Sequence, residues 1–174
     1  MSRISVAGLF IATIIAGTIV MPAMFGIDDN FLALIFLVAL IVVYGTKDWI
    51  VWSGVIMAAA VELLQGIYPG SLVMSWLLTA WVWHLMTQFF SLRPLLESSR
   101  RGIIAHVAAG LLLLGIMSFA MIGIEYGFYG HSVTPAVLQR VVHMPMIILW
   151  VVVTTTVYLM LLGGLGRKGT SYYG

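Results

Sequence analysis

The feature that most constrains this chain is a series of long apolar stretches, which contain none of its charged residues except Glu62. Of its 174 residues 62% are hydrophobic and 8% are charged. A soluble domain carries roughly 25% charged residues, so this chain has too few polar side chains to cover a water-exposed surface. The sequence therefore predicts an all-α, polytopic membrane protein.

A membrane-spanning helix needs about 20 apolar residues, and the apolar stretches predict a six-helix transmembrane bundle. We expect one transmembrane domain over residues 1–165 and a short cytoplasmic tail over 166–174. The expected spans are 4–25, 31–46, 49–65, 72–90, 102–124 and 142–165. The second has only a short apolar core, 31–44, which as a helix reaches about 21 Å against a hydrocarbon thickness near 30 Å. Whether it crosses completely stays open.

Basic residues orient the predicted bundle. With six spans and a cytoplasmic N-terminus, seven of the eight lie on the cytoplasmic side, where Lys and Arg are favoured. Those seven are Arg3, Lys47, Arg93, Arg100, Arg101, Arg167 and Lys168, and only Arg140 lies outside. We therefore expect both termini in the cytoplasm.

The same composition excludes several classes of function. There is no cysteine, and no zinc-protease, serine-hydrolase or phosphate-loop motif. Eight basic residues spread between spans are an orientation signal and not a nucleic-acid footprint. The sequence therefore predicts a protein that is not an enzyme, with no catalytic residue, cofactor or metal, whose surroundings are the lipid bilayer.

Glu62 is the first candidate functional residue, because a carboxylate within a span is costly and by default faces protein or water. Two interpretations stand side by side. Glu62 reaches the headgroup region at the outer end of its span, or it caps, pairs or hydrogen-bonds within the bundle and fixes the turn that follows.

Histidines on two neighbouring spans form a second candidate group. Leu77, Trp81, His84 and Gln88 follow helical spacing and share one face, and an antiparallel hairpin would bring His106 level with His84 and Gln88. An interhelical polar contact is one interpretation. Ligation of a haem by His84 and His106 is the other.

Small residues four apart predict faces where helices pack closely. The pairs are Ala12 with Ala16, Gly54 with Ala58, and Ala105 with Ala109. Trp76 and Trp83 lie seven apart on one helical face, and we expect them to face lipid.

The stretch from Ala58 to Phe89 reads AAAVELLQGIYPGSLVMSWLLTAWVWHLMTQF. It resembles the rod-shape-determining MreD family, in which an acidic residue ends an apolar helix and glycines follow four and eight positions later. Here these are Glu62, Gly66 and Gly70, with Pro69 in the turn; the family more often has Asp at the first position. Gly66 lets the chain leave the helix, Pro69 and Gly70 set the turn, and the acid can satisfy backbone donors there.

The resemblance implies a non-enzymatic scaffold of the bacterial cell-elongation machinery. Its partners would be an MreC-like membrane protein and peptidoglycan synthases, and the corner from Glu62 to Gly70 would shape the surface that binds them.

One rival interpretation is the substrate-binding component of an energy-coupling-factor vitamin importer. In that case Ala12 and Ala16 would contact the transport subunit. The outer polar residues would bind a small molecule; they are Glu62, Glu125, His131, Arg140 and His143. A haem-binding membrane redox protein is the third interpretation.

Overall fold

The computed structural model describes residues 3–20, 31–66, 68–89, 101–130, 152–158 and 160–161. These residues form helices joined by turns, with no strand among them. The helices are α1 (Arg3–Ile15), continued by a π-helical turn η1 (Ala16–Val20), α3 (Phe31–Tyr44), α4 (Asp48–Gln65), α5 (Ser71–Phe89) and α7 (Arg101–Tyr129). Residues 152–158 and 160–161 are also helical. The sixth predicted span is described only there, and the predicted tail, His131, Arg140 and His143 lie outside the described residues.

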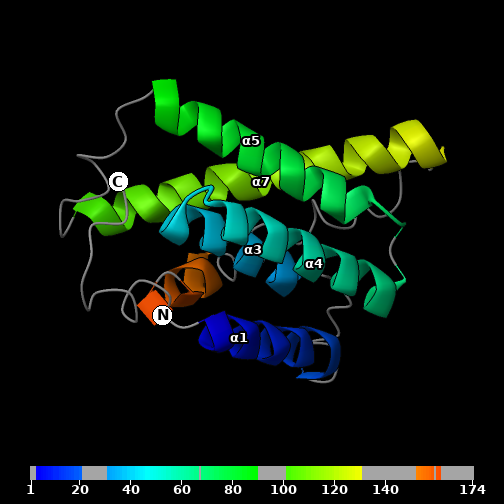
Figure 1. The fold of residues 1–174 in the computed structure, drawn as a ribbon, viewed down its shortest axis with the longest axis horizontal. Helices are drawn as coiled ribbons and strands as arrows, with labels where there is room; N and C mark the ends of the chain where they lie inside the picture. Colours follow the sequence, from blue (N-terminus) through cyan, green and yellow to red (C-terminus); the bar gives the residue numbers. More distant parts are fainter. Residues whose placement is uncertain are drawn as a thin grey trace.

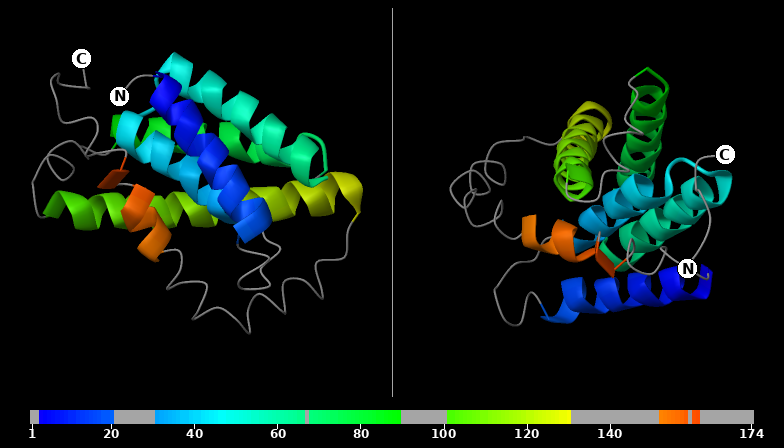
Figure 2. Two further views of the ribbon diagram at one scale, coloured as in Figure 1. Left: turned by 90° about the horizontal axis from the view of Figure 1, so that it is seen from below. Right: turned by 90° about the vertical axis from the view of Figure 1, so that its left-hand side faces the viewer.

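Consecutive helices run in alternating directions (Figure 1; Figure 2). The starts of α4 and α7 lie with the end of α5 at one end of the bundle, called here the Lys47 end. The end of α4, the start of α5 and the end of α7 lie at the opposite end, called the corner end. Each described helix is therefore antiparallel to the one before it in the chain.

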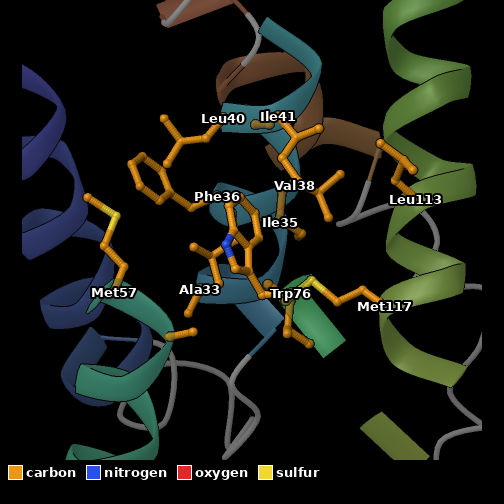
Figure 3. Packing of buried hydrophobic residues seen from close by; sticks show 14 of the residues in the cluster. Ala33, Ile35, Phe36, Val38, Leu40, Ile41, Met57, Trp76, Leu113 and Met117 are labelled. Carbon is orange, nitrogen blue, oxygen red and sulfur yellow. The ribbon is translucent and has the colours of Figure 1, made fainter. Parts of the chain in front are cut away.

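Helix α3 is the centre of the bundle. From Leu32 to Tyr44 its side chains are buried on every side, with Val43 partly buried. A helix that is apolar all round is stable only when it is enclosed, and α3 meets Met57 of α4, Trp76 of α5, and Leu113 and Met117 of α7 (Figure 3). Helix α3 is short, about 21 Å at 1.5 Å per residue. It is a core helix that other helices surround.

The C-terminal helical segment packs against α1 and α3. The Tyr158 hydroxyl lies 2.7 Å from Thr13 Oγ1, which itself donates to the carbonyl oxygen of Leu9. The Tyr158 ring makes an edge contact with Phe36 at a centroid distance of 5.4 Å. Segments from the two ends of the chain thus meet on the central helix.

Helices α3, α4 and α5 begin and end within two residues of the predicted apolar stretches. Helix α7 differs, because the sequence predicts a loop from Tyr126 onward and the helix continues to Tyr129. Gly127 does not end it. Gly130 does, with φ at 67° and its N–H bonded to the Tyr126 carbonyl at 3.2 Å.

The expectation that Trp76 and Trp83 face lipid is wrong. Both are buried, and both lie on the inner face of α5 together with Ser75, Thr79 and Ala80. Small and hydroxyl-bearing neighbours leave space for the two large rings. The large apolar residues of this helix that are exposed are Met74, Leu77, Leu78, Trp81 and Phe89.

Large apolar side chains are exposed on the outer helices at helical spacing. They include Ile11 and Ile15 on α1, Ile19 on η1, Trp52, Ile56 and Leu63 on α4, and Leu112, Phe119 and Tyr126 on α7. Within the described residues, α7 over Ile104–Tyr129 is the one helix that is both long and apolar enough to cross a membrane, while 6–19 and 32–44 are shorter apolar helices.

Candidate functional site

The candidate site is the corner between α4 and α5. Helix α4 ends at Gly66, which has φ at 64° and donates its N–H to the Glu62 carbonyl oxygen. Gly70, with φ at 87°, precedes the first residue of α5. Both glycines hold the left-handed conformation that costs other residues roughly 1–2 kcal/mol, which explains why the chain places glycine at these two positions.

The Glu62 side chain crosses this corner and caps α5. Its Oε2 accepts the N–H of Gly70 at 2.8 Å. Its Oε1 accepts the N–H groups of Leu72 at 2.6 Å and Val73 at 2.9 Å. The first N–H groups of a helix have no partner within it, and an Asn, Asp, Ser or Thr side chain just before the helix normally supplies one. Gly70 has no side chain, so the preceding helix supplies the cap.

The electrostatics of the corner match this arrangement. Glu62 is 7% exposed, and a buried carboxylate needs hydrogen bonds that compensate for lost hydration. Both of its oxygens act as acceptors here, as they do in the ionised form. The N-terminus of α5 adds the partial positive charge of the helix dipole. The interpretation that Glu62 hydrogen-bonds within the bundle and fixes the following turn agrees with this geometry, and the interpretation that it reaches the headgroup region does not.

Helix α7 holds the corner from the other side. The Tyr129 hydroxyl donates to the Pro69 carbonyl oxygen at 2.6 Å, and the Tyr129 and Tyr68 rings lie 4.6 Å apart between centroids. These contacts involve the last residue of α7, beyond the point where the sequence predicts that the helix ends. No local sequence pattern links these tyrosines to the corner, because Tyr129 is 60 residues from Pro69.

The α4–α5 hairpin is close-packed below the corner. Gly54 leaves the space that the Trp76 indole fills: a Cβ added at Gly54 would lie 2.0 Å from Trp76 Cζ2. The indole Nε1–H donates to the Val51 carbonyl oxygen at 3.1 Å. Ala58, the second member of this small pair, is fully buried. The sequence feature that indicates this contact is a glycine, Gly54, on one helix of the hairpin and a tryptophan, Trp76, on the other.

The other small pairs differ in their surroundings. On α7, Ala105 and Ala109 are partly buried, and the adjacent Gly110 lies against Thr155. On the N-terminal segment, Ala12 is exposed and Ala16 is partly buried. The described part of the chain therefore does not cover Ala12.

The histidine group lies at the Lys47 end. His84 Nε2 is 2.9 Å from Gln88 Nε2, and His84 Nδ1 is 3.3 Å from Thr46 Oγ1. His84 and Gln88 therefore meet as expected, and Thr46 is the partner that sequence reasoning missed. His106 is half-buried on α7. Both ring nitrogens of His84 thus lie within hydrogen-bond distance of a neighbouring side chain.

Within the residues that the structure describes, no three His, Asp or Glu side chains group as ligands of a metal ion. Comparison with known proteins found no matching family model, no similar curated protein and no similar solved structure.

Proposed function

We propose that this chain is a multi-pass scaffold of the bacterial inner membrane that belongs to the cell-elongation machinery, as its resemblance to the MreD family implies. The observation that carries the proposal is the bonding of Glu62 to Gly70, Leu72 and Val73. The residues on which the resemblance rests are the residues that build this corner, so the motif has a physical reason in this chain.

The exposed faces support a lipid environment. Trp52, Ile56 and Leu63 form an outward stripe on α4, and comparable stripes lie on α1 and α7. Large exposed apolar surfaces of this kind mark contact with a membrane or with other proteins. In the proposed topology six passes put both chain termini on the side of Arg3, Lys47 and Arg101, where cytoplasmic basic residues are expected, and the alternating helix directions support this proposal.

A scaffold role fits the chemistry of the corner. The Glu62 carboxylate is buried and accepts three backbone N–H groups at the start of α5, which is a structural role. Its effect is to hold two helices and their exposed residues in a fixed relation. We propose that an MreC-like membrane protein and wall synthases bind this preformed surface.

Affinity purification of the tagged chain from native membranes, followed by mass spectrometry, tests the proposal. We expect recovery of wall-elongation proteins, and we expect Gly66→Val to reduce it, because valine is strained at φ 64°. Gly115→Ala is the control, since nothing lies within 4 Å of a Cβ added there. Equal recovery with both variants, or no elongation protein in either sample, contradicts the proposal.

The importer component remains the second candidate because Ala12 is exposed on α1, where it is accessible to a transport subunit. Of the residues expected to bind its substrate, Glu62 is instead committed to the α5 cap. Recovery of an ATPase pair with a transport subunit, together with a copurified small molecule, would favour this candidate over the scaffold.

A further inference from the structure

A groove lies between the first half of α4 and the second half of α5, at the Lys47 end. It has a volume of about 250 Å³ and is lined by Thr46, Val51, Leu77, Ala80, Trp81 and His84. Trp81 is 60% exposed, so the groove opens on the outer surface of the hairpin. It is separate from the corner, which lies at the opposite end of the same two helices.

The lining changes from apolar to polar along the helices. Leu77, Ala80 and Trp81 form the apolar part on α5, and Val51 faces them from α4. Thr46 and His84 form the polar part at the end of the bundle, where Gln88 extends it by its contact with His84. An amphiphile with one apolar chain and one polar head has the same order of polarity.

The polar part suits an anionic head. The hydrogen bond between Thr46 and His84 is 3.3 Å long, near the long limit for such bonds, and both groups can donate to a phosphate oxygen. Lys47 follows Thr46 directly and is exposed, as is Asp48. The positive charge of Lys47 next to Thr46 favours an anionic group at this end of the groove.

The volume also limits the ligand. Pockets for drug-sized molecules measure about 300–1,000 Å³, and this groove lies below that range. It is large enough for part of one hydrocarbon chain.

We propose that this groove binds one membrane phospholipid, with an acyl chain along Leu77, Ala80 and Trp81 and the phosphate at Thr46 and His84. The inference rests on the membrane location given in the proposed function but not on the identity of the protein partners. It assigns a ligand to His84, Thr46 and Gln88, which have no part in the proposed scaffold role.

Native mass spectrometry of the full chain tests this proposal. The chain is reconstituted in vesicles of phosphatidylethanolamine and phosphatidylglycerol, returned to detergent and scored for retained phospholipid. Leu77→Trp fills the groove from its open side. Leu78→Trp is the matched control, because Leu78 is the adjacent residue, is 44% exposed against 38% for Leu77, and does not line the groove.

We expect the wild type and Leu78→Trp to retain one phospholipid, and Leu77→Trp to lower this retention about tenfold, which corresponds to about 1.4 kcal/mol. Thr46→Val removes a phosphate donor without filling the groove, and we expect a smaller loss. Equal retention by the two tryptophan variants, no retained phospholipid in the wild type, or retention of detergent in its place overturns the proposal. If the wild type retains no phospholipid but still recovers its protein partners, the lipid proposal alone is refuted. If the two termini lie on opposite membrane faces, both the lipid proposal and the proposed function are refuted.

Discussion

The two ends of the α4–α5 hairpin place polar residues in opposite ways. At the corner end, Glu62 is buried and accepts three backbone N–H groups. At the Lys47 end, His84 and Gln88 are exposed, and His84 contacts both Gln88 and Thr46. Burial makes every unmatched polar group costly, so the first set is required for the structure, while the second set is accessible to a ligand.

Removal of the Glu62 carboxylate should have the largest effect. Glu62→Leu leaves the N–H groups of Gly70, Leu72 and Val73 without their acceptor, and we expect a loss of about 3–5 kcal/mol in the free energy of unfolding. Unfolding of the purified protein in mixed micelles measures this loss.

Glu62→Gln is the matched variant for this prediction. Its amide keeps one acceptor oxygen and presents N–H donors where the second oxygen was, so we expect roughly half the loss of Glu62→Leu. Unchanged stability in Glu62→Leu would show that the cap contributes nothing.

The Gly54 contact is the second test, and it concerns the packing of the hairpin between its two ends. In Gly54→Ala the added Cβ would lie 2.0 Å from the fully buried Trp76 ring, and overpacking of this kind costs about 1–3 kcal/mol. Gly115→Ala, where a Cβ meets nothing within 4 Å, should instead raise stability by up to about 1 kcal/mol through helix propensity. The same unfolding assay applies, and a neutral Gly54→Ala contradicts the packing.

The helices and the corner can be predicted from the sequence because both depend on local patterns. Uninterrupted apolar runs give the bounds of α3, α4 and α5, and the spacing of Glu62, Gly66 and Gly70 marks a helix end, a turn and an acceptor within eleven residues of its donors. The same reasoning pairs His84 with Gln88, which are one helical turn apart.

Contacts between distant segments could not be predicted in this way. Trp76 and Trp83 occupy an apolar helix whose inner and outer faces have similar hydropathy, so composition does not tell which face is buried. The contacts of Tyr129 with Pro69 and of Tyr158 with Thr13 join residues 60 and 145 positions apart. Only the packing of the helices brings such pairs together.

Tyr129 provides an intermediate test at the corner end. Tyr129→Phe removes the hydroxyl that donates to the Pro69 carbonyl oxygen and keeps the ring beside Tyr68. Because Tyr129 is exposed, water can replace this bond, and we expect a loss of about 1 kcal/mol or less. Hydrogen exchange at Gly70 to Val73 should become faster in Tyr129→Phe and stay unchanged in Tyr126→Phe. Equal exchange in both variants would show that the hydroxyl does not hold the corner.

Changes at His84 should have the smallest effect on stability and so sharpen the contrast between the two ends. His84→Ala removes contacts to Thr46 and Gln88, but both partners are accessible and can bond water or lipid headgroups instead. We expect a change in unfolding free energy within about 0.5 kcal/mol, measured beside Glu62→Leu in the same micelles. A loss as large as that of Glu62→Leu would mean that the two ends do not differ in kind, and that His84 is needed for the packing of the hairpin and is not held available for a ligand.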